Sequence, residues 1–159
     1  MIQNDKFSIA SKISLRTIQN SDLKQFEQLL LQFYNEIEHG FSTDNLEEIL
    51  HDFLEKGMII LAIDDATNEI AGFISCIESN AIYARGNFGV INELYIIPKF
   101  RSQKLGQKLI DFIIEIAKKN NWSRLELDTP EVEKSEKTIR FYKKEGFVPI
   151  GFRMKKTIV

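Results

Sequence analysis

The sequence predicts a mixed α/β domain whose strands and helices follow the order β-α-α-β-β-β-α-β-α-β-β. Two observations carry this prediction. Two apolar runs, at 58–63 and 70–78, flank a polar turn and predict a hairpin. Further along, a strand pattern at 88–97, a long amphipathic pattern at 104–120 and a second strand pattern at 122–128 predict a β-α-β unit. Together they imply one mixed sheet with helices on its faces.

In the first quarter of the chain, apolar and polar residues alternate over 8–18, which predicts a first strand. Short polar side chains at 20–22 can accept the free N–H groups of a first helical turn. An apolar face at three- and four-residue spacing continues this helix to about Glu38. A second helix is predicted over 43–55, and Gly57 ends it.

The hairpin strands follow, with a nearly continuous apolar run at 58–63, a turn at 64–69 and a return strand over 70–78. We predict a polar loop over 79–87 and a strand over 88–97, which a proline closes.

The last third begins with the clearest helix, over 104–120, and a short alternating strand over 122–128. A helix over 135–145 ends at a glycine. Two final strands, over 147–150 and 152–158, are predicted on either side of another glycine.

The composition agrees with one domain over residues 1–159, because 43% of the residues are apolar and 28% are charged. The formal net charge of -2, with both signs intermixed, argues against a nucleic-acid-binding protein. The first ten residues lack an apolar signal core, and no stretch approaches the ~20 apolar residues that span a bilayer. We therefore expect a cytoplasmic protein.

The single cysteine, Cys76, excludes an internal disulfide, and its place in an apolar strand indicates a packed residue rather than a nucleophile. His39 and His51 are interpreted as surface residues. Neither has the neighbours of a ligand cluster, so no metal site is predicted.

The segment 92–106 carries the most specific chemistry, because a strand ends at a proline, a basic loop follows, and a long helix begins. Free N–H groups and the positive end of the dipole make a helix start suitable for phosphate. Gly106 would let the backbone approach closely, and Arg101, Lys104 and Lys108 add positive charge. We interpret this turn as a pyrophosphate cradle.

This turn resembles motif A of the GNAT acetyltransferase superfamily, whose loop reads Arg/Gln-x-x-Gly-x-Gly/Ala. Arg101 fills the first position and Gly106 the last, whereas Lys104 replaces the middle glycine. If that position needs a positive φ, Lys104 is strained by about 1 kcal/mol or more. If it needs only space, an outward lysine could help to hold phosphate.

A second stretch, 138–147, resembles motif B of the same family, a helix that ends in Phe-Tyr-x-x-x-Gly-Phe. Ser135 stands seven residues before Tyr142, where the family often has asparagine. The resemblance implies a single-domain, mostly antiparallel central sheet with a splayed pair of strands and helices on both faces. It also implies an N-acetyltransferase that moves an acetyl group from acetyl-CoA to a primary amine by direct attack.

The resemblance further implies that the backbone of Tyr95, Ile96 and Ile97 contacts the pantetheine arm of the cofactor. The other residues that the resemblance assigns to cofactor binding are Arg101, Ser102, Gln103, Lys104, Leu105, Gly106, Gln107, Lys108 and Ser135.

For catalysis, the resemblance implies that Tyr142 is the general acid for the departing thiolate, since a phenol has a pKa near ~10. The alternative is a tyrosine packed on the helix with its hydroxyl satisfied. Glu93 is the candidate base for the amine. Its alternative is a strand carboxylate that pairs with lysine or faces solvent. Asn92 points to the opposite face if the strand is regular.

The acceptor amine cannot be identified from the sequence. Phe26, Phe33, Tyr34 and Tyr83 could line its site, although core packing explains the first two better. The main alternative function is a CoA-binding sensor without turnover. A different nucleotide-phosphate binder is a weaker alternative, because no Gly-rich Lys-Ser/Thr loop is present. Family resemblance also suggests a possible homodimer through the last strands.

Overall fold

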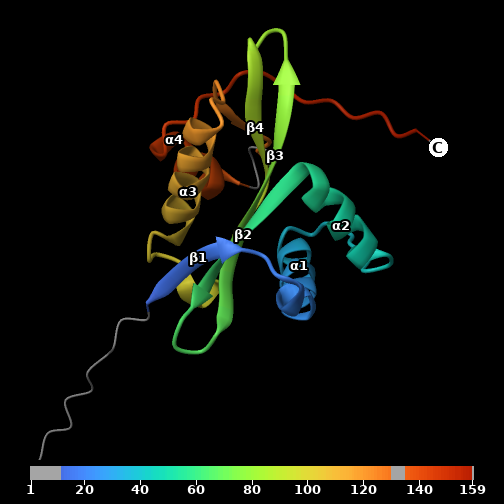
Figure 1. The fold of residues 1–159 in the computed structure, drawn as a ribbon, viewed down its shortest axis with the longest axis vertical. Coiled ribbons are helices and arrows are strands. Elements are labelled where there is room, and N and C mark those ends of the chain that lie inside the picture. Colours follow the sequence, from blue (N-terminus) through green and yellow to red (C-terminus); the bar gives the residue numbers. More distant parts are fainter. Residues whose placement is uncertain (1–11, 130–134, 159) are drawn as a thin grey trace, which may run out of the picture.

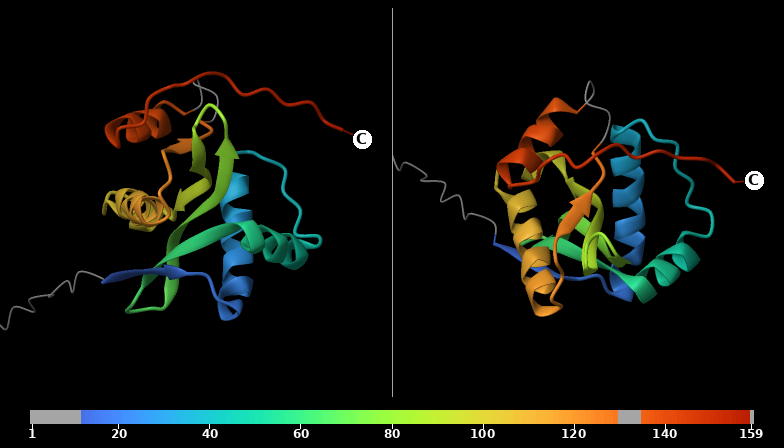
Figure 2. Two further views of the ribbon diagram at one scale, coloured as in Figure 1. Left: turned by 45° about the horizontal axis from the view of Figure 1, so that its top comes forward. Right: turned by 90° about the horizontal axis from the view of Figure 1, so that it is seen from above.

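The computed structural model describes residues 12–129 and 135–158, and within them five strands form a single sheet in the order β1-β2-β3-β4-β5. The strands are β1 (Ile13–Thr17), β2 (Gly57–Asp64), β3 (Glu69–Ala81), β4 (Gly86–Ile96) and β5 (Leu125–Leu127). The helices are α1 (Leu23–Glu36), α2 (Leu46–Lys56), α3 (Leu105–Lys119) and α4 (Glu136–Lys144). Helices α1 and α2 cover one face of the sheet, and α3 and α4 cover the other (Figures 1 and 2). The predicted α/β fold is confirmed.

Neighbouring strands from β1 to β4 pair antiparallel, whereas β5 pairs parallel to β4. The parallel pairing covers only Gly89, Ile91 and the residue between them, although β4 continues to Ile96. Within the described residues, the last part of β4 therefore has no partner strand on the β5 side. Such a gap between β4 and β5 is what a splayed pair of strands means. This mixed, mostly antiparallel sheet matches the prediction.

Two cores lie on the two faces of the sheet, and alternation along β2 builds both of them. Ile60 and Ala62 are fully buried in the cluster that contains the α3 side chains. Ile59, Leu61 and Ile63 are buried with α1 and α2. The continuous apolar run at 58–63 is thus explained by burial on both faces.

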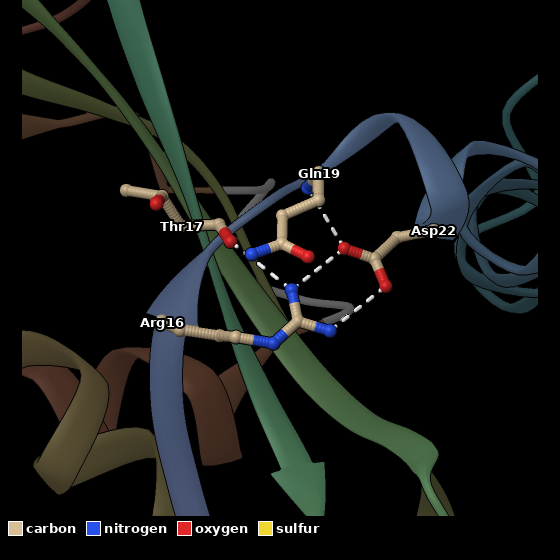
Figure 3. A network of polar contacts seen from close by, with 4 residues as sticks. All are labelled: Arg16, Thr17, Gln19 and Asp22. Atoms are coloured by element: carbon tan, nitrogen blue, oxygen red, sulfur yellow. Dashed lines mark hydrogen bonds and ion pairs between the residues drawn. The ribbon is translucent and has the colours of Figure 1, made fainter.

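An ion pair fixes the entry of the chain into α1 (Figure 3). Arg16 at the end of β1 donates to both carboxylate oxygens of Asp22, at 2.7 and 2.9 Å. The backbone N–H of Gln19 donates to the same carboxylate at 2.7 Å. These bonds close the turn at Asn20–Asp22 that precedes α1.

Several predicted boundaries differ from the structure. β1 spans only Ile13–Thr17, and the predicted positions before residue 12 lie outside the described residues. Helix α2 begins at Leu46 rather than 43, because Asn45 has a left-handed φ of 56°. β5 is also shorter than the predicted 122–128.

The predicted polar loop over 79–87 is wrong, because β3 and β4 extend through most of it. Ser79 pairs with Phe88, and Ala81 pairs with Gly86. The side chain of Asn80 donates to Asn87 at 2.5 Å. One face of this two-stranded ribbon is exposed and the other is half-buried, and most of its strand residues are polar or small, so the segment looks like a loop in sequence.

The two predicted C-terminal strands are also absent from the described residues. After α4 the chain runs as an extended segment over the end of the sheet and leaves the body of the molecule (Figures 1 and 2). Its apolar side chains are exposed at Val148, Ile150, Phe152, Met154 and Ile158. Among the described residues, no helix is long and apolar enough to cross a membrane.

Candidate active site

The start of α3 forms the candidate phosphate site. Lys104 precedes the helix with φ 59° and ψ 21°, so it occupies the left-handed region that the middle glycine of the motif would favour. Ser102 is also left-handed, with φ 66°. The first helical hydrogen bond joins the Lys108 N–H to the Lys104 carbonyl at 3.0 Å. The N–H groups of 105–107 therefore precede that bond and lie at the positive end of the helix dipole.

The positive charge at this helix start is exposed. The side chains of Lys104 and Lys108 are solvent-exposed, as are those of Ser102, Gln103 and Gln107. Leu105 as a whole residue is 2% exposed and its side chain packs in the core, so it presents no side chain to a ligand. The helix start and the exposed ammonium groups of Lys104 and Lys108 together fit an anionic group such as pyrophosphate.

Arg101 is held by α1 and β4 in this structure. Its guanidinium donates to both oxygens of Glu36 at 2.7 and 2.9 Å, and its Nε donates to the Ile96 carbonyl at 2.9 Å. The guanidinium also lies 5.5 Å from the ring centroid of Tyr95. Arg101 therefore ties the end of α1 to the unpaired end of β4.

Tyr95 completes this cluster. Its hydroxyl donates to Glu36 at 2.8 Å, and its side chain is buried. Burial and the neighbouring Glu36 carboxylate raise the pKa of Tyr95 to about 12. The backbone of Tyr95 and Ile96 pairs with β3, and the Ile97 N–H donates to the Ala71 carbonyl at 3.0 Å.

The candidate base, Glu93, lies beside a β-bulge. Glu93 pairs with Ser75, whereas the next pair joins Ile91 to Cys76, so Asn92 is the extra residue. The prediction that Asn92 points to the face opposite Glu93 required a regular strand. The bulge means that the strand is not regular at this point. Asn92 is exposed, and Glu93 is half-buried.

Two hydroxyl groups orient the Glu93 carboxylate. Tyr34 of α1 donates to one oxygen at 3.1 Å, and Ser75 of β3 donates to the other. The Glu93 backbone N–H donates in turn to the Ser75 hydroxyl at 3.0 Å. Burial and the Glu93 charge raise the pKa of Tyr34, so the phenol keeps its proton and stays a donor.

A pocket of about 110 Å³ opens beside Glu93, between α1, α2 and the sheet. Its polar lining consists of Tyr34, Ser75 and Glu93, and the remaining walls are apolar. Phe26 and Tyr34, two of the candidates for the acceptor site, line this pocket, and Phe26 is also part of the core, which is the explanation that the sequence favoured. Phe33 does not line the pocket.

Tyr142 lies on the other face of the sheet, in the core that α3 and α4 share. The ring is 8% exposed and meets Phe147 edge-on, with ring centroids 5.6 Å apart. Burial raises its pKa to about 12. No hydrogen bond joins its hydroxyl to another described residue, and the acid role and the alternative of a packed phenol with a satisfied hydroxyl both stay predictions.

The two motif segments contact each other through Gly106 and Phe141. A Cβ placed on Gly106 would lie 3.0 Å from the Phe141 ring, so the missing side chain makes room for α4. The side of Gly106 where a Cβ would stand thus faces a protein side chain. Ser135 is buried at the start of α4.

The remaining candidates lie elsewhere. Tyr83 is exposed near the tip of the β3–β4 hairpin, where its hydroxyl contacts Glu126. His39 packs against the Tyr34 ring at 5.5 Å between centroids, and His51 is exposed beside Asp52. Cys76 is fully buried, and burial raises the pKa of its thiol to about 12, as suits a packed residue.

Sequence reasoning missed Glu36 and Ser75. Ser75 carried a weak signal, since it is a hydroxyl inside an otherwise apolar strand. Glu36 carried none, because a glutamate near the end of an amphipathic helix is ordinary.

The fold and this site define an acyltransferase of the GNAT type, and comparison with known families agrees. Residues 23–147 match the family described as the acetyltransferase (GNAT) family, which is most of the chain. The chain belongs to the GNAT family of acetyltransferases. This family transfers an acyl group from acetyl-CoA.

Similar proteins bear names of the same kind. An uncharacterized N-acetyltransferase of Archaeoglobus fulgidus is 26% identical over 72% of this chain and 80% of that protein. An uncharacterized N-acetyltransferase of Schizosaccharomyces pombe is 27% identical over 86% of this chain and 83% of that protein.

Solved structures share the fold. An acetyltransferase of Trypanosoma brucei superposes with a TM-score of 0.75 at 24% identity, over 92% of this chain and all of that one. A glucosamine-6-phosphate N-acetyltransferase of Arabidopsis thaliana has a TM-score of 0.74 at 19% identity, over 93% of this chain and 99% of that one.

Proposed function

We propose that this protein acetylates a primary amine, with acetyl-CoA as donor, Glu93 as base and Tyr142 as acid. The observation that carries the proposal is the pairing of two sites at the unpaired end of β4. A cationic helix start lies on the α3 side, and a pocket with one carboxylate lies on the α1 and α2 side.

The donor side is formed by the start of α3. The N–H groups of 105–107 and the exposed ammonium groups of Lys104 and Lys108 bind the pyrophosphate. The backbone of Tyr95 and Ile96 at the open end of β4, and of Ile97 after it, hydrogen-bonds the pantetheine arm. Acetyl-CoA supplies the thioester carbonyl that the amine attacks.

The acceptor side supplies the base. Glu93 takes the proton that the amine loses, directly or through one water molecule. Tyr34 and Ser75 hold its carboxylate in one orientation. A fixed orientation favours proton transfer because the base does not need to reorganise.

The departing CoA thiolate needs a general acid. Tyr142 is protonated at neutral pH, since its pKa is raised to about 12. Its hydroxyl gives a proton to the CoA thiolate as the acyl bond breaks. No enzyme nucleophile is required, consistent with the buried thiol of Cys76.

The test is thiol release from acetyl-CoA with a panel of amines that includes alkylamines, diamines, amino acids and glucosamine 6-phosphate. We expect turnover with at least one amine and N-acetyl product by mass spectrometry. Tight CoA binding without turnover on any amine would instead support the alternative of a CoA-binding sensor.

Three predictions of the sequence remain proposals. We propose that residues 1–159 form one domain, that the protein acts in the cytoplasm, and that the exposed C-terminal segment pairs with a second copy of the chain.

A further inference from the structure

The pocket beside Glu93 combines one charged group with a wall that is otherwise apolar. One end carries the carboxylate and the two hydroxyls that contact it. The rest of its wall is hydrocarbon, with Phe26, Leu30, Phe41, Leu46, Leu50 and Phe53 among the lining residues. An occupant therefore meets one negative group and an apolar surface.

The charge of the pocket limits what can bind. Among the described residues that line it, none is Lys, Arg or His, and Glu93 is the one acidic residue. A carboxylate or phosphate on the acceptor would have no cation to pair with, and a second ammonium would have no second carboxylate. Burying such a charge without a partner is strongly unfavourable.

The pocket is small. An engineered apolar cavity of about 150 Å³ accepts benzene and stays dry when empty. A pocket of about 110 Å³ therefore suits a branched alkyl chain or a small ring.

From these observations we infer that the acceptor is a primary amine with a small apolar substituent and no second charge, its ammonium on Glu93 and its hydrocarbon in the pocket. This inference rests on the proposed function, because it assigns the acceptor of that same reaction. It makes the apolar wall the part of the site that selects the substrate.

Matched pairs of amines test the inference directly. Butylamine and 1,3-diaminopropane have similar size, but the diamine replaces the terminal methyl by an ammonium. Leucine is 3-methylbutylamine with an added carboxylate. We expect kcat/KM to be about 100-fold or more higher for the apolar member of each pair. From ethylamine to butylamine, kcat/KM should rise by about fourfold per methylene.

A pair of variants tests whether the selectivity between amines arises in this pocket. Ile49 lines the pocket and is 56% exposed on α2, so Ile49→Glu adds a carboxylate at the pocket with little risk to the fold. It should raise kcat/KM for 1,3-diaminopropane about tenfold and lower that for butylamine. Leu54→Glu is the control, since Leu54 is 39% exposed on the same helix and does not line the pocket.

The outcomes separate this inference from the proposed function. Faster acetylation of leucine, the diamine or a sugar amine than of the apolar amines would overturn the inference and leave the acetyltransferase intact. An equal response to Ile49→Glu and Leu54→Glu would also overturn it. If no amine is acetylated, the proposed function fails. Saturation-transfer NMR then tests whether butylamine binds to the protein at all. Absence of binding would overturn the inference.

Discussion

Tyr142 is the residue whose role depends most on its surroundings. Its ring is packed between α3 and α4, whereas its hydroxyl has no partner among the described residues. The substitution Tyr142→Phe keeps the packing and removes only the proton donor. We expect kcat to fall by about 10²–10⁴-fold with the Kd of CoA unchanged. Steady-state kinetics and calorimetry measure the two quantities, and unchanged kcat would remove Tyr142 from the acid role.

Lys104 is the departure from the motif, and its φ of 59° shows that the position needs the left-handed conformation. Lys104→Gly removes strain of about 1 kcal/mol but adds freedom to the unfolded chain, so we expect a gain of up to about 1 kcal/mol in unfolding free energy. Lys104→Ala is the matched control, because alanine keeps the strain and should not stabilise. Chemical denaturation measures both variants.

The same two variants ask whether the Lys104 ammonium holds phosphate. Both remove the charge, so both should weaken CoA binding by a similar factor if the ammonium contacts the pyrophosphate. Calorimetric titration with CoA supplies the comparison. Equal affinity in the parent and both variants would show that Lys104 only shapes the turn.

Arg101 has two possible ways of acting, because it pairs with Glu36 in this structure. We expect Arg101→Ala to weaken CoA binding by about tenfold or more, as the loss of a charge-assisted contact would. Glu36→Gln is the companion variant, since it breaks the ion pair and leaves the guanidinium free. An equal loss of affinity in both variants would mean that Arg101 acts by anchoring α1 and not by contacting phosphate.

At the scale of elements, the junction between β1 and α1 depends on Asp22 (Figure 3). The Arg16 guanidinium holds the pKa of this carboxyl below its usual value of 3.8. A lowered pKa in the folded state stabilises the fold above the unfolded pKa, and this contribution is lost as the pH falls through the folded pKa. The junction should therefore weaken in acid.

Asp22→Asn tests this junction. We expect the variant to be about 2 kcal/mol less stable at pH 7, because Arg16 loses its charged partner and one of the two oxygens that accept its hydrogen bonds becomes an amide NH2 group. The difference from the parent should shrink as the pH falls below about 4. Urea denaturation across this range measures it, with Asp52→Asn as an exposed control. A difference that is independent of pH would contradict the assignment.

Helices were the elements that the sequence predicted best. The apolar faces of α1, α3 and α4 repeat at helical spacing, and their observed bounds lie within a few residues of the prediction. Strand ends were predicted less well, because pairing partners decide them. The strand residues at the tip of the β3–β4 ribbon are mostly polar or small, so no strand pattern is visible there, and nothing in the sequence marks Asn92 as the extra residue of a bulge.

For the candidate site, the two motifs predicted where the start of α3 and Tyr142 would lie, since both depend on local sequence. The contacts around Glu93 could not be predicted in this way. Tyr34 reaches Glu93 across 59 residues, and Ser75 reaches it across 18. Such contacts follow from how the helices pack on the sheet, which a local pattern does not contain.

At the scale of the whole molecule, the proposed site joins two layers. The acceptor pocket belongs to the α1 and α2 face, and Tyr142 belongs to the α3 and α4 face. The end of β4 lies between them, where β5 no longer pairs. The Glu36–Arg101 ion pair connects α1, the helix that lines one wall of the pocket, to the turn before α3.

The C-terminal segment after α4 has apolar side chains that the rest of the molecule does not cover. Val148, Ile150, Phe152 and Met154 alternate with other residues, as in a strand with one apolar face. β5 is an edge strand of the sheet, and Arg153 contacts Asp128 just after it. A second copy of the chain offers the same edge and the same apolar segment, so mutual strand addition would cover both.

We therefore expect a dimer in solution that depends on this segment. Phe152→Asp should raise the dimer dissociation constant by at least about tenfold, because burying a phenylalanine contributes about 1.5–3 kcal/mol. Thr157→Asp is the matched control, since it adds the same charge on the polar side of an extended segment. Sedimentation equilibrium measures both, and circular dichroism checks that the fold is kept. A parent protein that stays monomeric at high micromolar concentration would contradict this dimer, because strand addition between copies must respond to protein concentration.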